Sequence, residues 1–165
     1  MDEEKKENQA EQAEQAESKR YLFVTVDHVE YGIDISIVQE IIVIQEISPL
    51  PGMKPFCRGV INIRGMIVPV IDLRVKIGLQ QCEYNENACI VVMMLGGEQI
   101  GVIVEDVREV LQIPPSQLQE SPARSDAGGK RSISSRIANI NGTVKQILDM
   151  YKVLDIDPDS EHIIR

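Results

Sequence analysis

The segment NIRGMIVPVIDL, residues 62–73, recurs later in the chain as NINGTVKQILDM, residues 139–150. At this offset of 77 residues, Gly65 falls on Gly142. Each copy is an apolar run, a short turn and a second apolar run that ends in aspartate. A strand–turn–strand unit of this kind is typical of a hairpin in a small antiparallel sheet. The repeat therefore predicts a duplicated, mainly β fold.

A second repeat precedes the first in each copy. The segment YLFVTVDHVEYGIDI, residues 21–35, resembles CIVVMMLGGEQIGVIV, residues 89–104, and the offset is now 69 residues. Within the hairpin this offset superimposes Gly32 on Gly101. The same offset continues after the hairpin, where it superimposes Val38 on Val107, Glu40 on Glu109, and Ile41 on Val110. The larger offset of the later repeat predicts a longer connection in the second copy. Pro, Ser and Gly mark residues 113–135 as that loop.

Each copy is predicted to contain two strands, a short helix, an irregular link, two further strands and a final short helix. The first helices are expected at ISIVQEII and VREVLQI, and the second after Asp72 and Asp149, which we interpret as helix N-caps. Short strands separated by turn signals are typical of small antiparallel barrels. The expected division is one barrel over about residues 21–80 and another over about residues 88–154.

Arg64 stands out because the second copy supplies a comparison. The turn of the second copy is Asn141-Gly142, which suits a two-residue hairpin turn because both residues tolerate positive φ. The first copy has Arg64-Gly65 in the same place, although arginine is a poor choice for such a conformation. The fold does not need arginine there, so we expect Arg64 to present its guanidinium to a partner.

The first twenty residues, MDEEKKENQAEQAEQAESKR, contain no aromatic or β-branched side chain. Such a segment buries too little apolar surface to offset its ordering entropy, which predicts a disordered acidic leader or a frayed helix. It is acidic and lacks an apolar stretch, unlike a secretory signal peptide. Residues 155–165 are expected to form a C-terminal tail.

The net charge of −9 disfavours nucleic-acid binding, because phosphates require a basic surface. It also disfavours direct contact with an anionic membrane. The longest apolar run, residues 88–95, is far shorter than the roughly 20 residues that span a bilayer. A soluble cytosolic protein is the expectation.

Motifs for chemistry are absent from the sequence. Cys57, Cys82 and Cys89 are odd in number and form no CxxC pair, so neither a metal site nor a disulfide framework is predicted. His28 and His162 have no nearby nucleophile and no metal-ligand spacing. The sequence therefore predicts no catalytic residue, no metal and no cofactor.

Three segments, EYGIDISIVQEI, KPFCRGVINIRGMIVPVIDLR and GVIVEDVREVL, resemble the CheW family of chemotaxis coupling proteins. The resemblance runs from about Tyr21 to Leu154, and GVINIRG followed by IVPVIDLR is its most specific part. It implies two five-stranded SH3-like β-barrels with short helices, in agreement with the internal duplication. The acidic leader has no expected counterpart in the family.

The resemblance also implies a function. Proteins of this family are non-enzymatic adaptors that couple the cytoplasmic tips of methyl-accepting chemoreceptors to the histidine kinase CheA, through the CheW-like regulatory domain of that kinase. Such an adaptor is cytoplasmic and is recruited to membrane receptor arrays by its partners. The receptor tip is expected near the groove between the barrels. The implied receptor-binding positions are Val38, Glu40, Arg58, Gly59 and Arg64.

Other interpretations remain open. The same module occurs inside CheA and in receiver-fused coupling proteins, but the absence of a kinase motif and of a receiver-sized segment favours a stand-alone adaptor. The first alternative is a small-molecule-binding module with a deep apolar pocket in the interbarrel groove. An enzyme is the next alternative. A nucleic-acid-binding barrel comes last, since it needs basic and aromatic faces and the chain has two Phe, four Tyr and no Trp.

Overall fold

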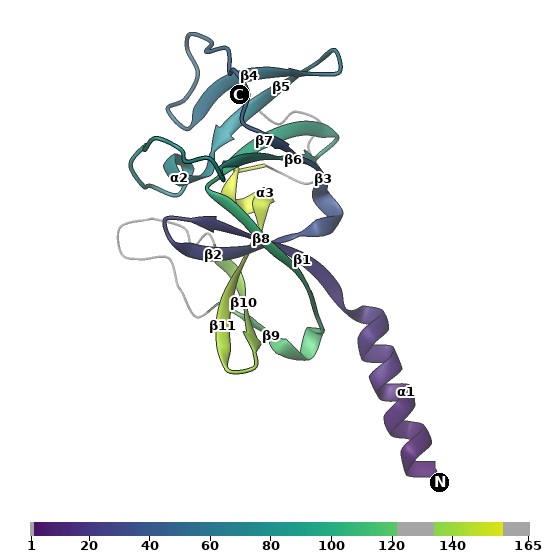
Figure 1. Cartoon of the computed structure of the whole chain (residues 1–165). Coiled ribbons are helices and arrows are strands. Elements are labelled where there is room, and N and C mark those ends of the chain that lie inside the picture. The colour runs from purple at the N-terminus through teal and green to yellow at the C-terminus, as the bar shows by residue number, and fades with distance from the viewer. Residues whose placement is uncertain (1, 122–133, 157–165) are drawn as a thin grey trace.

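The computed structural model describes residues 2–121 and 134–156. Within them the chain is mainly β, as predicted, and forms two sheets, one above the other in Figure 1. In order of hydrogen-bonded neighbours, the six-stranded sheet consists of β8 (Asp106–Ile113), β1 (Lys19–Val26), β2 (Val29–Asp34), β11 (Thr143–Leu148), β10 (Ser134–Ile140) and β9 (Leu118–Glu120).

The second sheet has five strands in an equivalent order. They are β3 (Val38–Val43), β6 (Cys89–Leu95), β7 (Glu98–Val104), β5 (Met66–Asp72) and β4 (Cys57–Ile63). Ser48 extends this sheet through an antiparallel bridge to Val60, with two backbone hydrogen bonds of 2.9 Å. The short β9 extends the other sheet in the same way, since it pairs with β10. Each sheet therefore has five principal strands and a short sixth partner.

The two copies of the sequence repeat exchange their first hairpins. The β1–β2 hairpin comes from the first copy but pairs with β8 and β11 of the second. The β6–β7 hairpin comes from the second copy but pairs with β3 and β5 of the first. The sheets consequently do not follow the expected division into residues 21–80 and 88–154. Similarity between the copies reveals equivalent strands, but it does not reveal which copy supplies the pairing partner.

The register of the two sheets preserves the duplication. Gly32 of β2 lies opposite Ile147 in a parallel pair, and Gly101 of β7 lies opposite Val70 in the equivalent pair. A Cβ atom on Gly32 would lie 2.6 Å from Ile147 Cδ1, and one on Gly101 would lie 2.8 Å from Ile90 Cγ2. Close packing between neighbouring strands therefore explains both glycines.

Three apolar clusters hold the fold together. One cluster lies between the sheets and combines Leu22, Val24 and Ile33 of the six-stranded sheet with Val91 and Val102 of the five-stranded sheet. The other two clusters each lie within one sheet. Apolar burial in the first cluster holds the two sheets together, and each sheet also has a smaller cluster of its own.

A short helix follows the last strand of each copy. In α2 (Leu73–Lys76), the second and third residues donate their backbone N–H groups to Asp72 Oδ1. In α3 (Met150–Val153), the second and third residues donate in the same way to Asp149 Oδ1. The predicted N-caps are confirmed. The expected helices at residues 35–42 and 107–113 are wrong. A three-residue 3-10 turn, η1 (Ile35–Ile37), is followed by the edge strand β3, and the second segment is β8.

The reason is visible in β3, where partly buried and exposed residues alternate along the strand. This period of two, together with the β-branched side chains, favours a strand over a helix. The loop expected over residues 113–135 contains a second 3-10 turn, η2 (Pro115–Gln117), and β9. Residues 122–133, and the part of the expected tail from residue 157 onward, lie outside the described residues.

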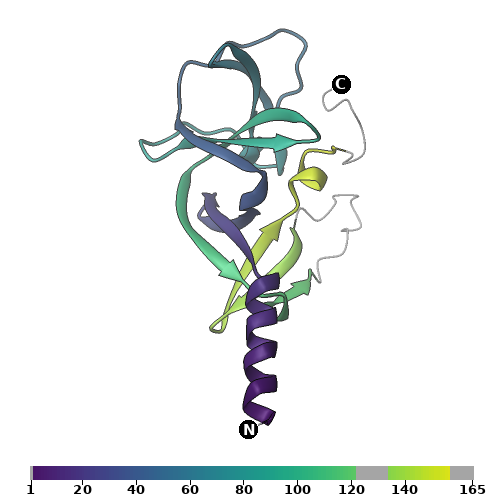
Figure 2. The same cartoon turned by 90° about the vertical axis from the view of Figure 1, so that its right-hand side faces the viewer.

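The acidic leader forms a helix, α1 (Asp2–Glu17), which projects away from both sheets (Figures 1 and 2). The expectation of disorder is wrong for this segment, and the helical alternative is closer. Ala, Glu, Gln and Lys are strong helix formers, and Asp2, Glu3 and Glu4 favour the positive end of the helix dipole. Residues 2–13 are exposed, so the helix adds little to the core.

Candidate protein-binding site

The turn between β4 and β5 has the geometry that the repeat predicts. Arg64 and Gly65 have φ angles of 49° and 85°, and Asn141 and Gly142 have 51° and 81° in the equivalent turn. In the first turn the N–H of Gly65 donates to Asn62 Oδ1 at 2.9 Å, and the N–H of Gly142 donates to the equivalent Asn139 at 3.2 Å. These values define a two-residue turn with both central residues at positive φ. Arg64 therefore occupies a conformation that arginine rarely adopts.

The side chain of Arg64 reaches Glu40. Arg64 Nη2 donates to Glu40 Oε1 at 2.5 Å, and the two side chains are 76% and 26% exposed. Glu40 belongs to β3 and Arg64 follows β4, the two edge strands of the five-stranded sheet. The pair therefore brings together two of the predicted receptor-binding residues and links the two edges of one sheet.

Packing between the sheets explains why position 38 is an apolar residue. Val38 is half-buried against the cluster between the sheets, and the equivalent Val107 packs against the same cluster. A bulge at Gln39 follows Val38, since Val38 pairs with Met93 and Glu40 with Val92. This bulge shifts the pairing of β3 with β6 immediately before Glu40.

Arg58 and Gly59 lie at a second bulge, in β4. Cys57 pairs with Ile71 and Gly59 with Val70, which leaves Arg58 as the extra residue. Gly59 is buried at φ 136°, and a Cβ atom there would lie 2.2 Å from the carbonyl oxygen of Ser48. Glycine is therefore required by close backbone contact. In the described part of the chain, no hydrogen bond or ion pair joins Arg58 to Arg64 or Glu40.

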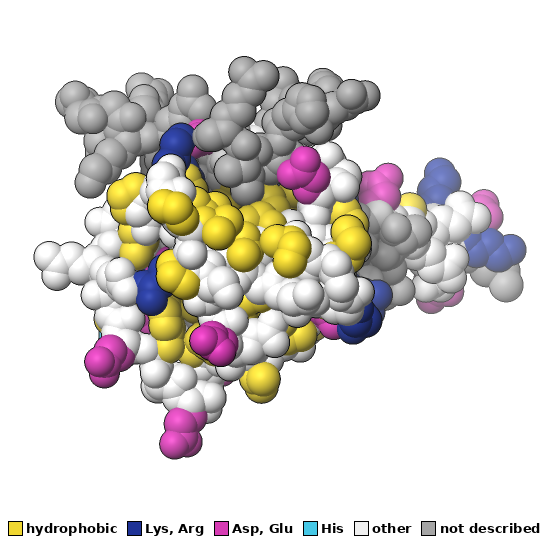
Figure 3. All heavy atoms as spheres, turned by 90° about the horizontal axis from the view of Figure 1, so that it is seen from above, with side chains coloured by type: hydrophobic (Ala, Val, Ile, Leu, Met, Phe, Trp, Pro, Cys, Tyr) yellow, Lys and Arg dark blue, Asp and Glu magenta, His cyan; other side chains and the backbone are white. Residues whose placement is uncertain are grey.

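Exposed apolar side chains surround the candidate site and recur in the other sheet. Ile67, three positions after Arg64, is 64% exposed, and the equivalent Val144 is 63% exposed. Ile41 on β3 is 45% exposed, and the equivalent Val110 on β8 is 44% exposed. Figure 3, viewed from the end that carries β4 and β5, shows apolar side chains gathered on this face. The sequence alignment paired these positions but did not reveal their exposure.

Polar side chains next to these apolar positions differ between the two sheets. On the six-stranded sheet, Lys145 donates to Glu30 at 3.0 Å and to Glu109 at 3.2 Å. Burial lowers the pKa of Lys145, but the hydrogen bonds to both carboxylates outweigh it and raise the pKa above the usual value. The five-stranded sheet has the Arg64–Glu40 pair instead. Equivalent apolar positions therefore sit beside different charged groups.

The cysteines and the side chains that could bind a metal are the remaining candidates for chemistry. The three cysteines are free thiols. Among the described residues, no three His, Cys, Asp or Glu side chains are arranged to hold a metal ion. A shallow hollow of about 630 Å³ lies on the six-stranded sheet, and its lining includes the charged residues Glu30, Glu105, Asp106, Arg108 and Lys145. This lining differs from the apolar pocket that a small-molecule module would have.

The fold and site define a duplicated β domain whose candidate surface is suited to contact with another protein. The family comparison gives the class a name. The CheW-like domain model matches residues 20–157, and the chain belongs to this family.

Individual relatives agree with this assignment. The chain is 38% identical to the chemotaxis protein CheW of Klebsiella aerogenes over 104 residues, which is 63% of this chain and 63% of that protein. It is 29% identical to CheW of Bacillus subtilis over 137 residues, 83% and 87% of the two chains. The crystal structure of the scaffolding protein TtCheW from Thermoanaerobacter tengcongensis matches the fold, with a TM-score of 0.77 at 24% identity over 90% of this chain and 99% of that chain. Its duplicated SH3-like fold is the fold predicted from the sequence.

No helix in residues 2–121 and 134–156 is long and apolar enough to cross a membrane.

Proposed function

We propose that this chain is a non-enzymatic chemotaxis adaptor that couples the cytoplasmic tips of chemoreceptors to the histidine kinase CheA. Membership of the CheW-like family supports the proposal, and the relatives carry the names chemotaxis protein and scaffolding protein. In this proposal the protein acts in the cytoplasm. Its partners recruit it to receptor arrays at the membrane.

The observation that carries the receptor contact is the position of Arg64. A tight turn holds its backbone, its side chain is 76% exposed, and Glu40 accepts a hydrogen bond from Nη2. A guanidinium has five N–H donors, so donors remain for a carboxylate or carbonyl group of a partner. Exposed Met66 and Ile67 follow the turn and offer apolar surface beside the charge. Val38, Arg58 and Gly59 remain predicted contacts of the same surface.

The exposed apolar pairs support a contact with the kinase. Val110 and Val144 on the six-stranded sheet correspond to Ile41 and Ile67 near the Arg64 turn, so the six-stranded sheet keeps a similar apolar surface for the kinase when the receptor occupies the first. A regulatory domain built from the same module would present equivalent surfaces. Two such sheets can pack their exposed apolar positions against each other and exclude water.

The proposal is tested with the purified chain, a receptor fragment and a kinase fragment that contains the regulatory domain. Isothermal titration calorimetry should show binding to each fragment separately, and receptor-dependent kinase activity should require the chain. Ile67→Ser should weaken receptor binding, whereas the matched Val144→Ser should not, because Ile67 lies beside the Arg64 turn. Absence of binding to both fragments would refute the adaptor function.

A further inference from the structure

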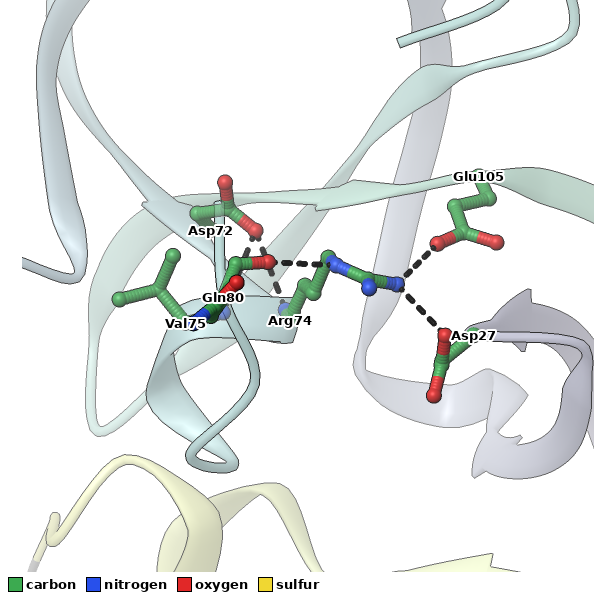
Figure 4. A network of polar contacts seen from close by, with 6 residues as sticks. All are labelled: Asp27, Asp72, Arg74, Val75, Gln80 and Glu105. Atoms are coloured by element: carbon green, nitrogen blue, oxygen red, sulfur yellow. Dashed lines mark hydrogen bonds and ion pairs between the residues drawn. The ribbon is translucent and has the colours of Figure 1, made fainter. Parts of the chain in front are cut away.

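Arg74 lies at the centre of a polar network that neither the repeat nor the proposed binding surface explains. It belongs to α2, directly after the five-stranded sheet, and its side chain is 17% exposed. Its Nη1 donates to Asp27 Oδ1 at 3.0 Å and to Glu105 Oε1 at 2.9 Å, and its Nε donates to the carbonyl oxygen of Gln80 at 2.6 Å. Figure 4 shows the guanidinium directed toward both carboxylates.

The two carboxylates come from different parts of the fold. Asp27 lies in the β1–β2 turn of the six-stranded sheet. Glu105 lies between β7 and β8, where the chain passes from the five-stranded to the six-stranded sheet. Its N–H donates to the carbonyl oxygen of Thr25 in β1 at 3.0 Å. The network of Asp27, Arg74 and Glu105, here called the inter-sheet clamp, therefore joins both sheets at a crossing of the chain.

The second copy of the repeat shows that the fold of one copy does not require these residues. The position equivalent to Arg74 is Tyr151, and the position equivalent to Glu105 is Ser36. Ser36 lies at the other crossing, where its N–H donates to Asp34 Oδ1 at 2.9 Å within a local turn. Ser36 at one crossing therefore makes a local hydrogen bond, whereas Glu105 at the other belongs to the inter-sheet clamp.

The β1–β2 turn retains Asp27 despite an unfavourable backbone conformation. Asp27 and His28 have φ angles of 52° and 63°, while Gly96 and Gly97 occupy the equivalent turn at 55° and 82°. Glycine adopts these angles without strain, and side chains with a Cβ adopt them at a cost. The carboxylate contact with Arg74 accounts for an aspartate at a position that glycine suits better.

We propose that Arg74 is a positioning residue that fixes the orientation of the two sheets relative to each other. The core between the sheets is apolar, and apolar burial favours contact without specifying direction. A guanidinium held by two carboxylates and one carbonyl group supplies directional contacts between the sheets. The functional consequence, which rests on the adaptor function proposed above, is that binding at one sheet is transmitted to a partner on the other.

Two glycine variants separate the inter-sheet clamp from the turn. Asp27→Gly and His28→Gly both place in the first copy a residue that the second copy uses, so both should fold. Asp27→Gly removes one of the two carboxylates that accept hydrogen bonds from Arg74. Within the described residues His28 is exposed and makes no hydrogen bond or ion pair, which makes His28→Gly the matched control. Arg74→Gln removes the charge from the other side of the contact.

The readout is the distance between spin labels on the two sheets, measured by double electron–electron resonance. The labels are attached through a non-canonical amino acid at exposed Gln119 in β9 and exposed Met66 in β5, so the three native cysteines stay in place. Asp27→Gly and Arg74→Gln should give a wider distance distribution than wild type, and His28→Gly should not. A wild-type distribution in Asp27→Gly, or equal widening in His28→Gly, would overturn the proposal. If Arg74→Gln does not fold, Asp27→Gly decides.

A binding experiment tests the functional consequence. Asp27→Gly should bind the receptor and kinase fragments separately with wild-type affinity, but receptor-dependent kinase activity should fall on the order of fivefold or more. Unchanged kinase control in a variant with loosened sheets would overturn the consequence. If the wild-type chain binds neither fragment, the adaptor function fails, and the distance measurement still decides whether the inter-sheet clamp orients the sheets.

Discussion

Arg64 and Glu40 lie at the opposite edges of one sheet, and Arg64 Nη2 donates to Glu40 Oε1 at 2.5 Å. A partner that binds this arginine therefore meets a guanidinium already oriented by a carboxylate. Because Arg64 is 76% exposed, water screens the pair, and its contribution to stability is at most about 1 kcal/mol. The contact thus positions the side chain more than it stabilises the fold.

Glu40→Ala should weaken receptor binding with little effect on stability. The substitution removes the carboxylate that orients Arg64, and an exposed pair contributes about 0.2–1 kcal/mol. Glu109→Ala is the matched control, because Glu109 occupies the equivalent position and pairs with Lys145 instead. Thermal melts and calorimetric titration of both variants with the receptor fragment test this. Equal loss of receptor affinity in the two variants would contradict a specific role for Glu40.

Gly65→Val should damage the fold more than Arg64→Ala. Gly65 has φ 85°, and a Cβ atom there would meet nothing within 4 Å. The loss of stability in Gly65→Val therefore comes from the backbone conformation alone. A strained residue of this kind costs about 1–3 kcal/mol. Gly65→Asn is the control, because asparagine tolerates positive φ better. Urea denaturation should rank Gly65→Val as the least stable, and equal stability of all three variants would argue against the tight turn.

Gly59→Ala should destabilise the protein by more than about 2 kcal/mol, because its Cβ would lie 2.2 Å from the Ser48 carbonyl oxygen and its φ is 136°. Gly52→Ala is a useful comparison, since Gly52 also has positive φ but has open space around it. Chemical denaturation of both variants measures the difference. A Gly59→Ala protein as stable as Gly52→Ala would show that backbone contact does not explain this glycine.

Deletion of residues 1–17 should leave the melting temperature and the affinity for both partners unchanged. Residues 2–13 of α1 are exposed to solvent and mostly carry charged or amide side chains, and β1 begins at Lys19. Differential scanning calorimetry and the two titrations are the measurements. A lower melting temperature or a lost partner would assign a role to the acidic helix.

The local features of the fold follow from the sequence. The two-residue turns, the positive φ of Gly65 and the capping roles of Asp72 and Asp149 could be predicted because short-range chemistry determines them. The pattern at residues 35–42 and 107–113 predicts helices where the structure has mainly strand, because a short apolar run does not distinguish a helix from a strand. Pairing with β6 and β1 decides the matter.

Long-range relationships could not be predicted in the same way. The exchange of hairpins between the two copies leaves the repeat pattern unchanged, so the sequence does not reveal it. The Arg64–Glu40 contact joins residues 24 positions apart, and the Arg74–Asp27 contact joins residues 47 apart. Only the arrangement of the sheets brings these side chains together. The difference between Arg74 and Tyr151 was the available signal for the second contact.

The central claim is that the arginine of the first turn serves a partner and not the fold. Arg64→Asn tests it most directly, because it gives the first copy the Asn-Gly turn that the second copy already uses. The variant should melt at or above the wild-type temperature. A charged hydrogen bond contributes about 1.5–3 kcal/mol, which corresponds to a loss of receptor-fragment affinity on the order of ten- to a hundredfold. Kinase-fragment affinity should change less. Unchanged receptor affinity in a folded Arg64→Asn protein would contradict the account.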